Sequence, residues 1–297
     1  MLKRSITGQE YNLLRQLLSM HETSLIKSLP KVLSKYYHQG DILYTQDYIY
    51  VIGDIPVGLI AHLDTVHAFP PATIYHDSRQ GVLWTPEGLG ADDRAGVFSI
   101  VQILEQGYRP SVIFTTGEEV GGVGAKKIIE AYPSPLSEIL FLIELDRQGS
   151  RDAVYYDCGN RDFEDFITRF GFTTECGSFS DIAIIGPAWD RASVNLSIGY
   201  INEHLATEML FYRDMFATID KVVQILDNHG DIIYDYQPNI HRLFSYYNER
   251  GVEIQVCDCC ANAIEVSNII QVGHGKSAWY LCRECAEEHT NRCRKCG

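Results

Sequence analysis

Short apolar segments alternate with amphipathic ones over residues 48–230, and this alternation constrains the fold more than any other feature of the sequence. Several of the apolar runs have no polar face, which is typical of strands in a sheet that is covered on both sides. The strand-like runs are 48–53, 57–63, 111–116, 139–145, 153–158 and 193–201, and the helical segments are 94–107, 124–132, 161–171 and 207–230. We therefore expect an α/β fold, a three-layer α/β/α sandwich with a mixed, largely parallel sheet.

The two ends of the chain differ from this central region. Leucine and isoleucine residues at helical spacing predict two helices within the first forty residues, packed on the main body. After residue 256 the composition changes sharply to a cysteine-rich segment. The length of 297 residues allows one substantial domain and a small appendage. We predict a main domain at 1–240, a linker at 241–256 and a small cysteine-rich module at 257–297.

Charge and hydropathy exclude several classes of function. The formal net charge is -14, whereas a nucleic-acid-binding surface needs clustered Lys and Arg side chains. No apolar run reaches the length of about eighteen residues that would indicate a membrane-spanning helix. The first residues include basic side chains but lack the apolar stretch of a secretory signal. We expect a cytoplasmic protein that binds neither nucleic acid nor membranes.

Acidic and imidazole side chains recur where the apolar runs end. In open α/β sheets, ligands and catalytic groups gather at the carboxyl ends of the strands. A single such residue more often caps a turn, but a repeated pattern indicates a shared site. Several buried carboxylates need positive charge nearby. The residues concerned are His62, Asp64, Asp92, Asp93, Glu118, Glu119, Glu144, Asp146, Glu203 and His204.

Two divalent metal ions would supply that positive charge. Imidazole nitrogen and carboxylate oxygen suit zinc, and cobalt or manganese would accept similar ligands. Two ions about 3.5–4 Å apart can activate a water molecule for attack on a carbonyl group. The pattern therefore favours hydrolysis.

The motifs and their order resemble those of the co-catalytic zinc peptidases, the group that contains leucyl aminopeptidases, tripeptide aminopeptidases and glutamate carboxypeptidases. The matching segments are HLD at 62–64, GADDRAG at 90–96, GEEVGG at 117–122, an Asp after the next strand and a late His. The resemblance covers most of residues 48–210. It implies a di-metal catalytic domain at 1–240 and a metal-dependent exopeptidase, most simply an aminopeptidase acting on short peptides. The alternatives are an amidohydrolase or deacylase acting on N-acyl amino acids, and a non-catalytic, metal-stabilised binding protein.

The resemblance also implies roles for individual residues. Asp92 would bridge two metal ions, with His62 and Asp146 completing one site and Glu119 and His204 completing the other. Glu118 would be the general base. Asp64 would hydrogen-bond the second ring nitrogen of His62 and so fix its tautomer.

Two of these assignments leave alternatives open. Asp93 directly follows Asp92, so either could bridge. Strand alternation places Glu144 on the same side as Asp146 and does not choose between them.

Other residues near the motifs have weaker assignments. Ser180 and Asp181 lie in a segment that resembles one beside the active site of related peptidases, so they are candidates for substrate contact. A Ser or Asx turn before a strand explains them equally well. We interpret His67 as a loop residue rather than a ligand. The short spacings from His62 to Asp92 and from Asp146 to His204 leave no room for a large inserted lid domain.

The C-terminal segment predicts structural zinc. Seven of the nine cysteines lie between Cys257 and Cys296, mostly in C-x-x-C pairs that each supply half of a tetrahedral site. We expect a tetrathiolate site from Cys257, Cys260, Cys282 and Cys285, and a second site is possible if Cys259, His274 or His289 joins Cys293 and Cys296. A site from the last two pairs is the alternative. The module could stabilise the chain, assemble a homo-oligomer or bind a protein partner.

Overall fold

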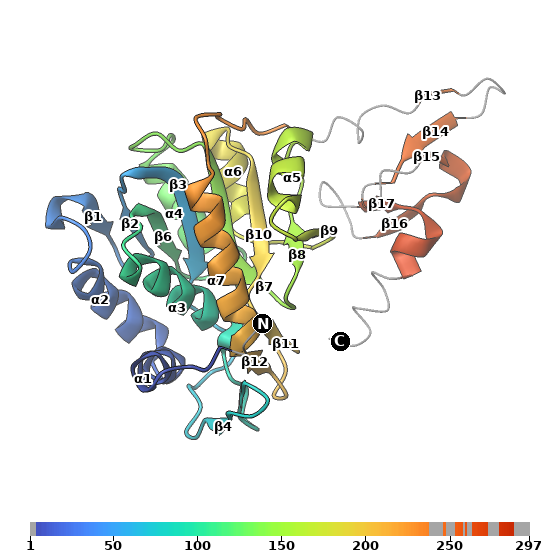
Figure 1. Ribbon diagram of the computed structural model, residues 1–297. Coiled ribbons are helices and arrows are strands. Elements are labelled where there is room, and N and C mark those ends of the chain that lie inside the picture. The colour runs from blue at the N-terminus through green and yellow to red at the C-terminus, as the bar shows by residue number, and fades with distance from the viewer. Residues whose placement is uncertain are drawn as a thin grey trace. The chain divides into compact units, whose positions relative to one another are not determined.

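The computed structural model describes residues 4–237, 246–247, 253–257, 259, 263–272 and 279–287 of the chain. It divides into two compact units, Met1–Tyr236 and Gln237–Gly297. Figure 1 shows the elements of both units. The assignment of separate functions to the predicted domains, 1–240 and 257–297, stays a prediction.

The first unit combines helices with two sheets. Its helices are α1 (Gly8–Leu18), α2 (Glu22–Leu33), α3 (Ala91–Glu105), α4 (Val123–Ala131), α5 (Arg161–Thr168), α6 (Ile182–Trp189) and α7 (Tyr212–Asp227), with a short 3-10 helix at Gln39–Asp41. Its strands are β1 (Ile42–Tyr44), β2 (Tyr48–Val51), β3 (Ile55–His62), β4 (Tyr75–Asp77), β5 (Val82–Trp84), β6 (Pro110–Thr115), β7 (Phe141–Arg147), β8 (Asp152–Val154), β9 (Thr173–Glu175), β10 (Ser193–Ser197), β11 (Tyr200–Ile201) and β12 (Met209–Phe211).

The large sheet is mixed, with a parallel centre. Its strand order is β1-β2-β6-β3-β7-β10-β8-β9. The four central strands β6, β3, β7 and β10 run parallel, whereas β2 and β8 pair with them in the antiparallel direction. The predicted fold class is confirmed. Since parallel neighbours end at the same edge, the segments that follow β3, β6 and β7 meet there.

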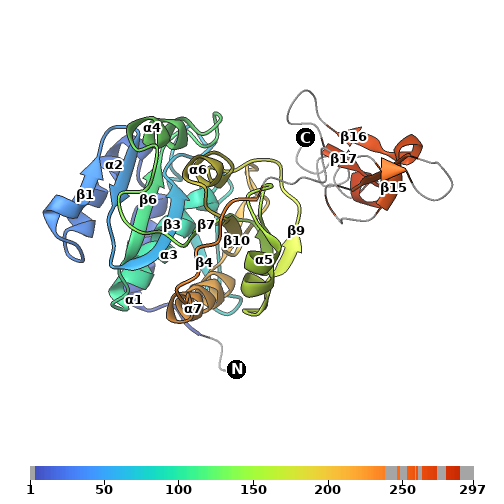
Figure 2. The ribbon, with the colours of Figure 1, turned by 90° about the horizontal axis from the view of Figure 1, so that it is seen from above.

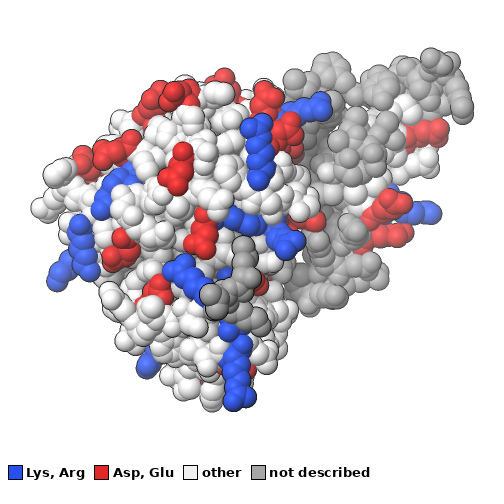
Figure 3. All heavy atoms as spheres, viewed as in Figure 1, with Lys and Arg blue, Asp and Glu red and all other residues white. Residues whose placement is uncertain are grey.

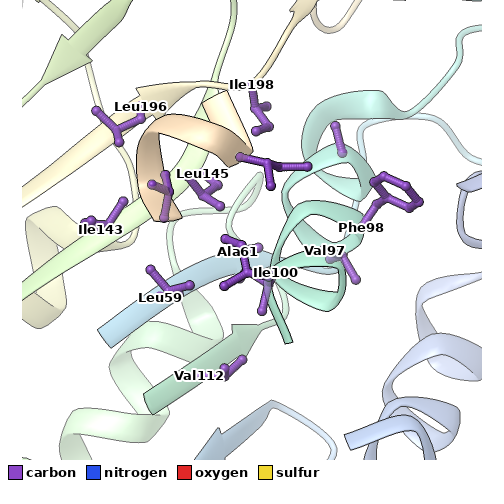
Figure 4. Close-up of a cluster of buried hydrophobic side chains, with 14 of the residues drawn as sticks. Leu59, Ala61, Val97, Phe98, Ile100, Val112, Ile143, Leu145, Leu196 and Ile198 are labelled. Atoms are coloured by element: carbon purple, nitrogen blue, oxygen red, sulfur yellow. The ribbon is translucent and has the colours of Figure 1, made fainter. Parts of the chain in front are cut away.

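Alternating side chains of β3 face two different layers of helices. Leu59 and Ala61 belong to the core cluster that includes residues of α3 and α7, whereas Ile60 belongs to the cluster that includes residues of α4 and α6. Figure 4 shows Leu59 and Ala61 pointing toward Val97 and Ile100 of α3. Seen from above in Figure 2, α4 and α6 lie on one side of the sheet, and α1 and α7 lie on the other. This arrangement is the predicted three-layer sandwich.

The N-terminal helices form where the sequence predicts them. Thr7 caps α1, because its Oγ1 accepts the Glu10 N–H at 3.2 Å while the Glu10 carboxylate accepts the Thr7 N–H at 2.8 Å. This reciprocal pair satisfies two backbone N–H groups at the start of the helix. The buried faces of α1 and α2 contribute leucines and an isoleucine to the cluster on the α3 side.

The structure corrects three sequence-based predictions about secondary structure. The long helix begins at Tyr212 and not at residue 207, because Met209–Phe211 form β12 and pair with β5 and β11. The run 193–201 is split into β10 and β11 at Gly199, whose φ of 96° leaves a side chain no room beside the Phe211 carbonyl. Residues 182–189 form helix α6, so no strand follows Asp181.

The second sheet lies in the same unit and carries one of the predicted site residues. Its order is β11-β12-β5-β4, and all of its neighbours are antiparallel. The hairpin of β4 and β5 lies between His62 and Asp92 in the sequence. His204 and Glu208 lie in the loop between β11 and β12.

The second unit contains little apolar core among its described residues. It comprises β13 (Tyr246–Tyr247), β14 (Glu253–Val256), β15 (Ala263–Glu265), a 3-10 helix at Val266–Asn268, β16 (Ile270–Val272) and β17 (Trp279–Leu281). Its buried cluster consists of Cys257, Leu281 and Ala286. Within the residues that the structure describes, no helix of either unit has the length and apolar composition needed to cross a membrane.

Candidate metal centre

His62 ends the central strand β3 and is surrounded by carboxylates. Its Nε2 lies 3.0 Å from Asp92 Oδ1 and 3.3 Å from Asp146 Oδ1, while its Nδ1 lies 3.3 Å from Asp64 Oδ1. The ring is 1% exposed. Asp64 therefore faces one nitrogen, and Nε2 points into the acidic cluster, where a metal ion would need it.

Asp92 lies between two histidines. Its Oδ1 faces His62, and its Oδ2 lies 3.2 Å from the Nε2 of His204. Each oxygen thus belongs to a different side of the cluster, which is the geometry a bridging carboxylate requires.

The neighbouring Asp93 binds backbone N–H groups instead of imidazole nitrogens. Its carboxylate accepts the backbone N–H groups of His62 at 3.3 Å and Gly96 at 2.9 Å, and it is fully buried. A side chain at Gly96 would come within 2.5 Å of this carboxylate and 2.3 Å of the Leu145 carbonyl oxygen. Asp93 and Gly96 hold α3 close to the sheet, and the geometry favours Asp92 as the bridging ligand.

Glu119 and His204 form the other side of the cluster. The Nε2 of His204 lies 3.0 Å from Glu119 Oε2. Glu119 follows β6, whereas His204 comes from the β11–β12 loop and has a positive φ of 64°. The His204 side chain is 48% exposed and that of Glu119 is 9% exposed. His204 therefore has less surrounding structure to hold it than Glu119 has.

The geometry separates Asp146 from Glu144. Asp146 Oδ1 faces His62 and also accepts the Tyr200 hydroxyl at 3.1 Å. Glu144 is fully buried, and its carboxylate accepts the Ser180 hydroxyl and the Ile182 N–H. Of the two, only Asp146 lies beside His62.

The charges of the cluster shift the pKa values of its members. Burial would lower the pKa of His62, but the carboxylates of Asp146, Asp64 and Asp92 raise it well above its usual value. Hydrogen bonds to Asp92 and Glu119 raise the pKa of His204 to about 11. Burial raises the pKa of Asp146 to about 7. The surroundings of both imidazoles thus favour positive charge at this point.

The residues present fit divalent metal ions. Ligand atoms of His62, Asp92 and Glu119 all lie within 4.8 Å of one another. Imidazole nitrogens and carboxylate oxygens together are the donors that zinc takes in catalytic sites. A pair of cations would replace protonated imidazoles as the compensating charge.

Asp64 connects His62 to the two adjacent glutamates. Its Oδ1 accepts the Glu118 N–H and its Oδ2 accepts the Glu119 N–H, each at 3.1 Å. Burial raises the pKa of Glu118 to about 9, and the carboxylates of Asp146 and Asp181 add to the increase while His62 opposes it. The turn that carries Glu118 is therefore fixed relative to the ring of His62.

Ser180 and Asp181 are both fully buried. The Ser180 hydroxyl donates to Glu144, and Asp181 accepts the Thr115 hydroxyl. These contacts place both residues in the packing between α6 and the sheet. Their predicted contact with substrate stays a prediction.

Three buried polar residues that contact the proposed ligands were not predicted from the sequence. Asn195 accepts the Asp146 N–H at 2.8 Å, and the Tyr200 hydroxyl donates to Asp146. Glu208 accepts the Asp92 N–H at 2.9 Å. An Asn within the apolar strand β10 was a usable signal. No such signal marked Glu208, because residues 207–230 were predicted to form one helix.

The second unit brings three of the predicted cysteines together. The sulfur atoms of Cys257, Cys282 and Cys285 lie within 4.8 Å of one another. The Cys282 N–H donates to the Cys257 sulfur at 3.2 Å, and the Cys285 N–H donates to the Cys282 sulfur at 3.5 Å. Cys259 is described but does not belong to this group, and the other candidates, Cys260, His274, His289, Cys293 and Cys296, lie outside the described residues.

Comparisons with known proteins find one matching family model. Residues 53–170 match the family model described as Peptidase family M28. A search of curated proteins found no match.

Solved structures similar to this chain include several aminopeptidases. Aminopeptidase PepT from Bacillus cereus has a TM-score of 0.57 at 15% identity, covering 76% of this chain and 100% of that one. A tripeptidase from Staphylococcus aureus has a TM-score of 0.58 at 14% identity, covering 76% and 99%. An aminopeptidase from the archaeon Desulfurococcus kamchatkensis has a TM-score of 0.55 at 12% identity, covering 76% and 99%. At these identities, the similarity shows a shared fold.

The family match spans the segment that carries most of the cluster, namely His62, Asp64, Asp92, Glu118, Glu119 and Asp146. The resemblance to the co-catalytic zinc peptidases is thereby confirmed: residues 53–170 match the model of Peptidase family M28, and several solved structures of the same fold are aminopeptidases.

Proposed function

We propose that the chain is a metal-dependent exopeptidase, an aminopeptidase that hydrolyses short peptides. The observation that carries this proposal is the position of Asp92 between His62 and His204, each beside a further carboxylate. The match to Peptidase family M28 and the aminopeptidase titles of similar structures support it.

We propose that two divalent metal ions bind in this cluster. His62, Asp146 and one oxygen of Asp92 would hold the first ion, and His204, Glu119 and the other oxygen of Asp92 would hold the second. The donor set suits zinc, and cobalt or manganese would bind the same atoms. Bound there, such ions supply the charge that activates a water molecule and stabilises the oxyanion of an attacked carbonyl.

The chain's own residues would move the proton and hold the ligands. Glu118 lies outside the ligand set but directly beside Glu119. Cations bound in the cluster would lower the raised pKa of Glu118, so its carboxylate would take a proton from the attacking water. It then returns this proton to the leaving nitrogen of the peptide. Asp64 keeps the His62 tautomer fixed and holds the Glu118–Glu119 turn through both backbone N–H groups.

The second unit would hold structural zinc. Cys257, Cys282 and Cys285 offer three thiolates in one place, and Cys260 is the proposed fourth ligand. Because the described core of this unit is small, metal binding would supply much of its stability. A second zinc bound through Cys293 and Cys296 stays a prediction.

Several finer predictions also remain proposals. A cytoplasmic location and a homo-oligomer or protein partner bound through the cysteine-rich module are among them. On the face in Figure 3, the described Lys and Arg side chains lie interspersed with Asp and Glu. This face therefore differs from a nucleic-acid-binding surface, in which Lys and Arg side chains are clustered.

An amidohydrolase acting on N-acyl amino acids is the closest alternative. The same cluster would attack its amide carbonyl, so only the groups that bind the rest of the substrate would differ. Assays of metal-loaded protein on aminoacyl and N-acyl amino-acid substrates separate the two. Hydrolysis of N-acyl amino acids alone would replace the aminopeptidase proposal.

The experiment that tests the mechanism compares two adjacent residues. Glu118→Gln should leave metal content unchanged and lower kcat by about 10²–10⁴-fold, because it removes the base and no ligand. Glu119→Gln should lower metal content as well, because it removes a ligand. Metal analysis and peptide hydrolysis of both variants check this. Substantial turnover by Glu118→Gln would contradict the mechanism, and full metal content without turnover in the unaltered chain would favour the non-catalytic binding protein.

A further inference from the structure

Glu208 is a fully buried carboxylate with three partners in the metal centre's own loops. Its Oε2 accepts the Gly90 N–H at 2.6 Å, and its Oε1 accepts the Asp92 N–H at 2.9 Å. The Nε2 of His67 lies 3.2 Å from Oε2. A carboxylate without such partners would be costly to bury, so its position is tied to these groups.

The two amide hydrogen bonds fix the backbone on both sides of Ala91. Gly90 has a positive φ of 66°, and Asp92 directly follows Ala91. A single carboxylate that binds both N–H groups therefore sets the direction in which the Asp92 side chain leaves the backbone. This direction decides whether the two oxygens of Asp92 reach His62 and His204.

Glu208 also anchors the loop that carries His204. The loop turns through backbone hydrogen bonds from the Leu205 N–H to the Asn202 carbonyl, at 3.2 Å, and from the Glu208 N–H to the Leu205 carbonyl, at 3.1 Å. His204 itself is half exposed, so side-chain packing contributes little to its position. Through Glu208, this loop is attached to the segment that carries Asp92.

We infer that Glu208 is a positioning residue that sets the separation of Asp92 and His204, and thereby the affinity of the metal site formed by Asp92, Glu119 and His204. The inference rests on the proposed pair of metal ions. The first site, with His62 and Asp146, depends on Glu208 only through Asp92. Loss of Glu208 should therefore weaken the second site more than the first.

Glu208→Gln tests this with little change in size. The amide oxygen can accept one of the two N–H groups, but its NH₂ group must then face the other donor. The matched control is Thr218→Val, which removes the buried hydrogen bond from the Thr218 hydroxyl to the Ser197 carbonyl, at 2.7 Å, in the same unit. Titration of metal-free protein with Zn²⁺ against a competing chelator measures each binding step. The step that disappears in His204→Ala identifies the second site.

We expect Glu208→Gln to weaken this step by about 10–100-fold, as is common for groups that orient ligands, and to shift the first site less. Thr218→Val should lower the melting temperature by about as much as Glu208→Gln does, but it should leave both Zn²⁺-binding steps unchanged. Unchanged Zn²⁺ affinity in Glu208→Gln, or equal weakening of both steps, would overturn the inference.

A second variant covers the case in which Glu208→Gln does not fold. Glu208→Asp keeps the charge but reaches only one of the two N–H groups, so it should weaken the same step. If neither variant folds, Glu208 is needed for folding and the positioning role is wrong. If the unaltered chain binds both ions but hydrolyses no peptide, the aminopeptidase proposal fails and this inference stands.

Discussion

At the residue scale, a few carboxylates determine the geometry of the whole cluster. Asp64 lies beside the ring of His62 and accepts the N–H groups of both residues in the glutamate turn. Glu208 accepts the N–H groups of Gly90 and Asp92 in the same way. Neither residue is a proposed ligand. Each holds the backbone of a ligand-bearing segment through hydrogen bonds and so orients the ligand side chains.

Replacing Asp64 should weaken metal binding without abolishing it. Asp64→Asn loses the charge opposite His62, and its NH₂ group meets a donor in the glutamate turn. We expect metal affinity to fall by about 10–100-fold and kcat to fall as well. Chelator competition and peptide hydrolysis measure the two effects.

The matched control is Asp77→Asn. Asp77, the last residue of β4, also accepts two backbone N–H groups, from Arg79 at 2.9 Å and Gln80 at 3.0 Å, but these belong to an exposed turn. Asp77→Asn should leave metal affinity and kcat unchanged. Equal effects of the two substitutions would assign the Asp64 result to general destabilisation.

At this scale, the sequence predicts which residue types are ligands but not the directions of their side chains. The motifs placed acids and imidazoles at the ends of β3, β6 and β7, and these residues do lie together. Spacing alone did not distinguish Asp92 from Asp93, because the choice depends on how the chain turns into α3. Glu208 was missed because its loop belongs to the second sheet, whose short strands carry too few residues for a clear pattern.

At the element scale, the centre of the sheet was the most predictable part of the fold. β3, β6 and β7 are apolar on both faces because helices cover both, and such runs stand out in the sequence. The short strands β4, β5 and β12 were not predicted. A strand of three residues is too short to show the alternation of apolar and polar side chains. Met209–Phe211 pair with β5 as a strand, although the sequence continues the helical pattern of the segment that follows.

Truncation of a central-strand side chain should reveal how much β3 contributes to stability. Leu59→Ala removes a fully buried side chain from the core between β3 and α3, so we expect a loss of about 2–5 kcal/mol in the free energy of unfolding. Leu136→Ala, at a side chain that is 46% exposed, should cost about 0.5 kcal/mol or less. Urea denaturation followed by circular dichroism measures both. A similar cost for the two would mean that the core around Leu59 relaxes to fill the space.

At the scale of the whole molecule, the two units are stabilised differently. The first unit buries a large apolar core on both faces of an eight-stranded sheet. In the second unit, the buried apolar cluster among the described residues consists of Cys257, Leu281 and Ala286. All proposed ligands of the catalytic ions lie in the first unit, and the clustered cysteines lie in the second. Removal of the cysteine-bound zinc should therefore affect the second unit and leave the catalytic ions in place.

Cys282→Ser tests whether the cysteine-bound zinc can be lost without loss of peptide hydrolysis. Since a serine hydroxyl is a poor zinc ligand, the variant should lose one zinc per chain, and the backbone of the second unit should exchange its amide hydrogens faster. Peptide hydrolysis should persist, because the cluster around Asp92 is unchanged. The control, Cys158→Ser, alters a buried cysteine of the first unit and should lose no zinc. Zinc analysis, hydrogen exchange and activity on the same samples decide the outcome. If hydrolysis disappears together with the zinc of Cys282→Ser, the cysteine-rich unit takes part in the reaction or in holding its substrate, and the two metal sites are not independent.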